Sequence, residues 1–443
     1  MVGPAGLNTP PGSMGLPLIG EALSYSRSPH RFVESREAEH GDVFKTRLLG
    51  DRVVCFVGPE AFTFFIDNPA FERAGAAPKQ IRELLCQRSL PLVGGEQHRA
   101  MRGKVSQVFT PDSLQRYLDT LQPIVEEFAE RWASLSRFGW VGEYKSLSAS
   151  VCAAMLLGDR TAGGGYERLV PLLDSFLAGL SAIPINLPWT RYGRALGSRD
   201  RLLSLIDEAI ARHRSGTCDD ILSRLLAARG QDGSGLAEEE LRAQMVHMFF
   251  AAYGGIFRVL SLMSMELGLH PDVRERVRKE VQTITPAGPI TMAALSRMQY
   301  LDDVTREVRR HNRIFATTFL STATADAEYG GYRVPKGWKV MGAIYATMQD
   351  PSVFTDPLRF DPERFSPGRA EDRKQPNSYV PHSGGSMDGH RCPAEDLATL
   401  VMKQAVAVLL RSYSWGLPPQ DLSLDSQPSP LPSDGLRVIF ERA

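Results

Sequence analysis

A glycine-rich loop that ends at a cysteine is the feature that most constrains the fold of this chain. The loop reads PHSGGSMDGHRCPAED and leads directly into an apolar stretch that predicts a helix over 393–412. Three residues allow sharp turns and the close approach of a flat ligand: Gly384, Gly385 and Gly389. Cys392 lies where the loop enters the helix, beside Pro393, which is favoured at the first helical position. Free N–H groups and the positive helix end favour thiolate over thiol, so Cys392 is a candidate nucleophile or metal ligand.

The other cysteines have no comparable setting. Cys55, Cys86, Cys152 and Cys218 are scattered along the chain, and no two cysteines form a CxxC zinc motif. They are too few and too far apart to predict a disulfide framework. We expect these four to be ordinary packing or surface residues. On the loop alone, a helix N-terminus that simply contains a cysteine is the alternative for Cys392.

Composition and charge argue against several classes of protein. The chain has 443 residues, of which 43% are hydrophobic, enough for a sizeable core. Lys plus Arg and Asp plus Glu both number 51, so no net charge indicates nucleic acid or an anionic membrane as partner. The N-terminus lacks the pattern of a signal peptide, and no stretch approaches the roughly 20 uninterrupted apolar residues that span a bilayer. We expect a soluble, cytoplasmic monomer that binds no nucleic acid and has no membrane span.

Helical periodicity dominates the chain, and strand character is confined to a few regions. The predicted helices before the loop cover 111–135, 144–158, 166–182, 198–213, 218–229 and 236–269. Strand character appears in a hairpin over 41–60, in 327–346 and in 436–441. We therefore expect one domain over 1–443, mainly α within the α+β class. Its small β part would come from about 20–70, 320–346 and the C-terminal tail.

Three further motifs precede the cysteine loop. The segment GGEQHRAMRGKV places His98 and Arg102 one helical turn apart. The segment TREVRR places Glu307 and Arg310 three residues apart on one helix face, where they can pair with each other and with a downstream backbone loop. The segment FDPERF, residues 360–365, follows. Alone, each motif is weak; their order before the cysteine loop is the informative feature.

Together these segments resemble the cytochrome P-450 family of haem-thiolate enzymes, in its soluble bacterial type, over nearly the whole chain. PPGSMGLPLIGEAL and FKTRLLG look like the N-terminal entry and first hairpin of that fold. INLPWTRYGRAL is similar to the retinoic-acid hydroxylase branch, and GHRCPAED and RLLG are similar to the fatty-acid peroxygenase branch.

The resemblance implies a helix-rich cytochrome P-450 fold with haem b, iron protoporphyrin IX, as the cofactor. It implies that Cys392 is the axial thiolate of the haem iron, where a thiolate favours O–O heterolysis. His98, Arg102 and His390 fall at positions where the family holds the haem propionates. Glu307 and Arg310 fall at the structural pair that supports the proximal side.

The predicted central helix departs from the family pattern at its middle. Counting back from His270 places Gly254 and Gly255 where the family has an acid followed by threonine, a pair that relays protons to dioxygen. Neither glycine has a side chain that can donate, accept or relay a proton. Two interior helix glycines also cost on the order of 1–2 kcal/mol relative to alanine. Close approach to haem or to a bulky substrate is one reason for them, and tight helix packing is another; water could still relay protons.

Smaller departures surround the cysteine loop, which has three extra residues before the cysteine. The substituted positions are His382 for the usual aromatic residue, Ala394 for a glycine, Arg313 for a common proline and Ser321 for a strand arginine. Because Ser321 replaces that arginine, one residue that would bind a haem propionate is left without a candidate.

Arg258 is a charge in an almost wholly apolar helix, four residues after Gly254 and so on nearly the same face. A buried guanidinium without a partner costs several kcal/mol. A substrate carboxylate could supply that partner through a bidentate bond. The alternative is a pair with an internal Asp or Glu away from the pocket.

The function that we expect is that of a haem-thiolate enzyme in secondary metabolism. Its substrate would be a lipophilic, isoprenoid or prenylated small molecule that carries an acid group. Because Gly254 and Gly255 replace the relay, we favour oxygen-independent chemistry: heterolysis of a substrate N–O or O–O bond, or use of peroxide, with oxo or nitrene transfer to an alkene and cyclisation. The alternatives are a conventional monooxygenase served by ferredoxin and its reductase, a zinc hydrolase with His382, His390 and Cys392 as ligands, and a non-catalytic haem- or ligand-binding scaffold.

Overall fold

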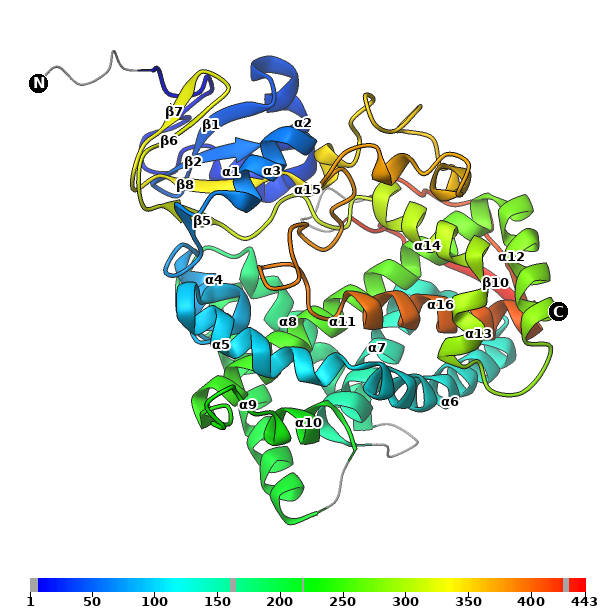
Figure 1. Ribbon diagram of the computed structural model, residues 1–443. Coiled ribbons are helices and arrows are strands. Elements are labelled where there is room, and N and C mark those ends of the chain that lie inside the picture. The colour runs from blue at the N-terminus through cyan, green and yellow to red at the C-terminus, as the bar shows by residue number, and fades with distance from the viewer. Residues whose placement is uncertain (1–6, 160–164, 217–218, 425–429) are drawn as a thin grey trace, which may run out of the picture.

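The computed structural model describes residues 7–159, 165–216, 219–424 and 430–443, and it shows a large helical part with a smaller β-rich part at one side (Figure 1). This arrangement confirms the predicted helix-rich fold with a small β part. Cys218 lies outside the described residues, and it is also the first residue of the helix predicted over 218–229.

The helices follow the predicted periodicity closely, and α6 to α11 correspond to the six helices predicted before the cysteine loop. Their bounds are α1 Ala22–Arg27, α2 Pro29–His40, α3 Pro59–Asp67, α4 Lys79–Leu84, α5 Gly95–Ser106, α6 Pro111–Leu135, α7 Trp140–Leu157, α8 Leu169–Leu180, α9 Arg191–Ser215, α10 Ile221–Ala227, α11 Glu238–Leu269, α12 Pro271–Ile284, α13 Met292–Arg297, α14 Gln299–His311, α15 Ile344–Thr347 and α16 Glu395–Ser412.

The strands form a five-stranded sheet in the order β1-β2-β8-β5-β3, a three-stranded sheet in the order β4-β10-β9, and the hairpin β6-β7. Their bounds are β1 Val43–Leu48, β2 Asp51–Phe56, β3 Phe71–Glu72, β4 Arg137–Gly139, β5 Ser321–Ala323, β6 Ala327–Tyr329, β7 Tyr332–Val334, β8 Lys339–Gly342, β9 Tyr413–Gly416 and β10 Arg437–Arg442. The five-stranded sheet joins the N-terminal hairpin to strands that lie almost 300 residues later in the chain. Sequence-distant segments therefore meet beside the helical part.

Two boundaries differ from the prediction. The strand character predicted over 327–346 ends at Gly342, and the last residues form the short helix α15. A short apolar run such as AIYA fits either structure, because it is too short to show a period. The helix predicted from 393 begins instead at Glu395. Cys392 therefore lies in the loop, three residues before the first helical residue.

The central helix α11 is the longest apolar element of the described chain. By length and composition it could cross a membrane, although Arg258 and Glu266 interrupt its apolar run. In the fold, however, most of its residues are buried, and it packs against α7, α8, α9, α14 and α16. Tyr144 and Ser148 of α7 fix it by hydrogen bonds to the Ser264 hydroxyl at 2.6 Å and the Tyr253 carbonyl at 2.9 Å. Its apolar sequence is explained by its place in the core.

Candidate active site

The cysteine loop is held open by a few specific backbone contacts before it enters α16. The Cys392 N–H donates to the His382 carbonyl at 3.1 Å. Gly384 and Gly385 adopt left-handed φ angles of 62° and 75°, and the Gly385 N–H donates to the Asn377 side chain at 3.0 Å. A Cβ at Gly385 would lie 2.6 Å from a methyl of Ile66, so both the conformation and the space at this position require glycine.

The environment of the Cys392 thiol contains opposing influences. Burial raises the pKa of Cys392, and the nearby Glu395 carboxylate adds to this effect. The Ala394 N–H and the guanidinium groups of Arg102 and Arg309 act in the opposite direction and favour the thiolate. The predicted thiolate-favouring donors are therefore present, but burial outweighs them in the protein alone. A bound metal cation would supply the remaining stabilisation, because a coordinating thiol is deprotonated outright.

Three residues predicted to contact the cofactor come together beside the loop. His98 and Arg102 lie on α5, and each is only 4% exposed. The ring of His98 packs against the ring of His390 with centroids 4.0 Å apart. The Arg102 Nη1 donates to the Arg391 carbonyl at 2.6 Å, which ties α5 to the cysteine loop. Residues almost 290 positions apart in sequence thus form one cationic cluster.

This cluster has the properties required to bind the carboxylates of haem. Within the described residues, His98 Nε2 and Arg102 Nε and Nη2 are buried without a hydrogen-bond partner. Burial, together with the charges of Arg102, Arg73 and Arg99, lowers the pKa of His98 to about 4. Buried, unpaired donors of this kind are expensive unless an acceptor is supplied. A dianionic ligand such as haem, with two propionates, fits the donor set.

Sequence reasoning missed Arg73, which lies next to the same cluster. It follows β3, is 5% exposed, and its charge lowers the pKa of both His98 and His390. The surrounding letters, FERAG, match none of the motifs considered. Only the fold shows that this arginine approaches α5 and the cysteine loop.

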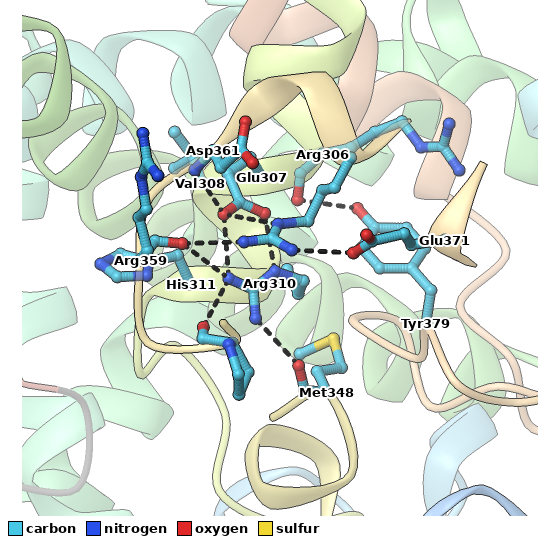
Figure 2. A network of polar contacts seen from close by, with 12 residues as sticks. Arg306, Glu307, Val308, Arg310, His311, Met348, Arg359, Asp361, Glu371 and Tyr379 are labelled. Atoms are coloured by element: carbon cyan, nitrogen blue, oxygen red, sulfur yellow. Dashed lines mark hydrogen bonds and ion pairs between the residues drawn. The ribbon is translucent and has the colours of Figure 1, made fainter. Parts of the chain in front are cut away.

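Glu307 and Arg310 form the predicted pair and stand at the centre of a larger buried network (Figure 2). Arg310 donates to the Glu307 carboxylate at 2.6 and 2.9 Å and to the Met348 carbonyl at 3.0 Å. Arg364, from the FDPERF segment, donates to Glu307 at 3.1 Å and to Glu371 at 2.8 Å. The network joins α14 to the irregular segment before the cysteine loop, so its role is to hold the backbone.

The arrangement of His382 argues against a zinc site. Its Nε2 lies 3.2 Å from Nη1 of Arg309, whereas the His390 ring packs against His98. Among the residues that the structure describes, no three His, Cys, Asp or Glu side chains are grouped to hold a metal ion. His382, His390 and Cys392 are therefore not brought together as zinc ligands. Arg309 also donates to Thr399 at 2.8 Å, a contact that the sequence did not indicate.

The two glycines of α11 have different surroundings. A Cβ on Gly255 would meet no atom within 4 Å, so open space lies beside this residue. Ala251, one turn earlier, is exposed although it sits in the middle of a core helix. A Cβ on Gly254 would instead lie 2.7 Å from Nη1 of Arg258 and 3.6 Å from Leu177 of α8. Helix packing thus accounts in part for Gly254, but it does not account for Gly255.

Arg258 folds back along α11 instead of pairing with a carboxylate. Its Nη1 donates to the Gly254 carbonyl at 2.9 Å, and its guanidinium lies 4.8 Å from the Phe257 ring centroid. The nearby Asp174 carboxylate accepts from Lys145 at 2.7 Å and from Tyr253 at 2.8 Å. No ion pair to Arg258 occurs in the described part of the chain, although the Asp174 carboxylate acts on its charge from a longer distance. Burial lowers the pKa of Arg258 to about 10.

Comparisons with known proteins place this site in a family. The sequence model of the family described as Cytochrome P-450 matches residues 10–439. Abscisic acid 8'-hydroxylase 2 of Oryza sativa subsp. indica is 30% identical over 444 residues, which cover 98% of this chain and 86% of the relative. The solved structure of retinoic acid bound cyanobacterial CYP120A1 is 32% identical, with a TM-score of 0.91 and coverage of 99% and 100%. Cytochrome P-450SP alpha, at 22% identity and a TM-score of 0.80, shares the fold.

A helical fold with a cysteine loop beside a cationic cluster is that of a haem-thiolate oxidoreductase. The chain belongs to the cytochrome P-450 family, and its cofactor is haem b. The predicted resemblance, fold class, enzyme class and cofactor are thereby confirmed.

Proposed function

We propose that this enzyme breaks an O–O or N–O bond carried by its substrate, or the O–O bond of peroxide, and does not depend on stepwise reduction and protonation of dioxygen. Within a single substrate the reaction is an isomerisation: the O–O or N–O bond breaks, one of the two released groups bonds to one alkene carbon with ring closure, and the other bonds to the second alkene carbon. With peroxide, one oxygen is transferred to the alkene and the other leaves as water. No external electrons are needed. Bound haem supplies the heterolysis, which a thiolate ligand favours.

The observation that carries this proposal is the glycine pair of α11. The side of the helix at Gly255 faces open space and bears no hydroxyl or carboxyl that could hold or pass a proton. A proton relay through side chains at these two positions is therefore absent. Chemistry that starts from a ready O–O or N–O bond does not require one.

In this proposal Cys392 provides the axial thiolate, and His98, Arg102 and His390 hold the propionates. The unpartnered nitrogens of His98 and Arg102 support the second role, because a carboxylate satisfies both. The pKa of His390 is lowered to about 2, first by burial and then by Arg73, so its ring is neutral at pH 7 and binds through its N–H. Glu307 and Arg310 hold the proximal backbone and take no part in the reaction.

We propose a lipophilic, isoprenoid or prenylated acid as the substrate, with Arg258 as the partner of the acid group. Its bond to the Gly254 carbonyl occupies only one of the five guanidinium donors, and no described carboxylate neutralises it. Relatives support this class: one solved relative is named for bound retinoic acid and another relative is an abscisic acid 8'-hydroxylase. In keeping with secondary metabolism, we place the enzyme in the cytoplasm as a monomer.

The second candidate is a conventional monooxygenase that receives electrons from a ferredoxin and its reductase. The relative named as a hydroxylase favours this function. In that case water held beside Gly255 would replace the side-chain relay. Both candidates share the haem site and the substrate class, so they differ only in the oxidant.

Restoring the relay separates the two candidates. The double variant Gly254→Glu, Gly255→Thr is compared with the parent enzyme, with retinoic acid as substrate and either hydrogen peroxide or oxygen with reduced ferredoxin as oxidant. We expect the parent to work better with peroxide and the double variant to lose this activity, because a carboxylate at 254 would pair with Arg258 in place of the acid group of the substrate, and two larger side chains would fill space in the pocket. A parent that needs oxygen and ferredoxin, with better coupling in the double variant, would establish the monooxygenase instead. The single variant Gly255→Ala is the matched control, since it adds only a methyl group in open space.

A further inference from the structure

Arg73 is a buried cation without a counter-ion. It is 5% exposed, and its guanidinium makes no hydrogen bond or ion pair to any of the described residues. The guanidinium carbon lies 6.0 Å from the centroid of the Phe319 ring. An uncompensated buried charge of this kind is strongly destabilising, and proteins keep one where a ligand supplies the opposite charge.

The carboxylate of Glu72, the residue before Arg73, forms no ion pair with its guanidinium in the described structure. Glu72 accepts the backbone N–H groups of Arg73 and Ala74 at 3.1 and 3.4 Å. Its carboxylate also occupies the position where a Cβ of Gly94 would stand. Glu72 therefore satisfies backbone donors at the end of β3 and leaves the guanidinium of Arg73 unpaired.

The charge of Arg73 lies close enough to α5 to act on the cationic cluster of the active site. It lowers the pKa of His98, whose ring packs against that of His390 with centroids 4.0 Å apart. Three sequence-distant segments thus bring positive or neutral nitrogen donors together: the end of β3, α5 and the cysteine loop. Such a cluster is unfavourable unless an anion is bound between its members.

Strand register relates Arg73 to the missing family arginine. β3 pairs antiparallel with β5, with Phe71 opposite Ala323 and Glu72 opposite Thr322. Continuing this register by one residue places Arg73 opposite Ser321. Directly opposite residues of an antiparallel pair project from the same face of the sheet. Ser321 is the position at which the resemblance predicted a strand arginine.

We propose that Arg73 binds a haem propionate and replaces, from the neighbouring strand, the arginine that is absent at Ser321. Its planar guanidinium can bind a carboxylate through two parallel N–H···O bonds. The guanidinium charge also affects the relative stability of ferrous and ferric haem. The rate of haem loss therefore reports on binding, and the reduction potential reports on charge. This inference rests on haem as the cofactor and is independent of the oxidant.

The test uses the purified holoenzyme and the variants Arg73→Leu, Arg73→Lys and Arg73→Leu with Ser321→Arg. Haem transfer to excess apomyoglobin gives the rate of haem loss, and spectroelectrochemistry gives the reduction potential. A lost charge-assisted bond of 1.5–3 kcal/mol corresponds to about 10- to 100-fold faster loss in Arg73→Leu. We expect a smaller increase in Arg73→Lys and partial restoration when Ser321→Arg returns the guanidinium across the strand pair. Arg52→Leu, an exposed arginine of the same sheet, is the matched control and should behave as the parent.

The outcomes separate this role from a structural one. Faster haem loss and a changed reduction potential in Arg73→Leu, both reversed by Ser321→Arg, support the proposal. Haem loss at the parental rate overturns it, as does an increase that Ser321→Arg does not reduce. If Arg73→Leu does not accumulate as a folded protein, the comparison of Arg73→Lys with the parent decides in the same way. A normal reduced carbon-monoxide spectrum in every variant would show that the thiolate site is intact, whatever the result for Arg73.

Discussion

The two glycines of α11 should respond in opposite ways to the same substitution. In the middle of a helix, replacing glycine by alanine stabilises the folded state by about 0.5–1 kcal/mol when the added methyl meets nothing. This condition holds at Gly255, where open space receives the Cβ. We therefore predict that Gly255→Ala raises the free energy of unfolding by about 0.5–1 kcal/mol.

At Gly254 the same gain in helix propensity is opposed by a contact. The new Cβ would lie 2.7 Å from Nη1 of Arg258, so the guanidinium must move and give up its 2.9 Å bond to the Gly254 carbonyl. A hydrogen bond from a charged donor contributes about 1.5–3 kcal/mol. Offset by the propensity gain, Gly254→Ala should cost about 0.5–2.5 kcal/mol. Because the propensity gain is common to both variants, they should differ by the hydrogen-bond contribution alone, about 1.5–3 kcal/mol.

A double-mutant cycle assigns the difference to Arg258. Thermal and urea unfolding of the holoenzyme, followed by far-ultraviolet circular dichroism, are measured for both alanine variants in the parent and in an Arg258→Ala background. Without the guanidinium, the two alanines should come within about 0.5 kcal/mol of each other, the limit for independent sites. Equal effects of the two alanines in the parent would refute the geometry described for Gly254. A difference that persists without Arg258 would assign it to Leu177 instead.

Three further outcomes are expected. Cys392→Ser should abolish the thiolate-haem band of the reduced, carbon-monoxide-treated protein while the far-ultraviolet spectrum stays that of the parent, and an unchanged band would reject Cys392 as the ligand. Arg258→Leu should weaken binding of an acidic substrate such as retinoic acid by about 2–5 kcal/mol in a spectral titration yet barely affect its methyl ester, whereas equal losses would make the arginine structural. Burial raises the pKa of Glu266 to about 7, so the folded state holds a proton that the unfolded chain has released, and stability should fall as pH rises from about 4.5 to 7. The Gln side chain of Glu266→Gln can still accept the hydrogen bond from Asn312 but does not titrate, so up to about 3 kcal/mol of the fall in unfolding free energy should disappear. Unfolding midpoints measured at a series of pH values test this, and a pH profile unchanged from the parent would contradict the assignment.

The helical framework could be predicted because its signals are local. The predicted helix over 111–135 coincides with α6, and the predicted run over 236–269 differs from α11 by two residues at its start. Apolar spacing, a threonine that caps α6 and a proline that follows α11 mark these elements within short stretches of sequence. The start of α16 was predicted two residues too early, because Pro393 fits a helix start as well as the end of a loop.

The site could be predicted only where short motifs carry it. His98, Arg102 and His390 lie together as the resemblance implied, and Glu307 pairs with Arg310. Arg73 could not be found in this way, because its position depends on the pairing of a two-residue strand with β5, which no local pattern encodes. The direction of the pKa shift at Cys392 could not be predicted from the sequence either. Burial, which dominates that shift, is a property of the complete fold.

The difference between Gly254 and Gly255 is another feature that only the packed structure reveals. In sequence the two residues are equivalent neighbours on one helix. In the fold, Gly254 faces Leu177 and Arg258, whereas Gly255 faces open space. The proposed chemistry depends on the second of these environments, since that is where a proton-relaying side chain would stand.

Turnover without oxygen tests the oxygen-independent chemistry most directly. The holoenzyme is incubated under argon, without NAD(P)H or ferredoxin, with a fatty-acid hydroperoxide, a lipophilic acid that carries its own O–O bond and alkenes. Rearranged product at a rate that oxygen and reductant do not increase is the predicted result, and it should disappear in Cys392→Ser. No product under argon, together with oxygenated product from the parent fatty acid once oxygen and reduced ferredoxin are supplied, would contradict it.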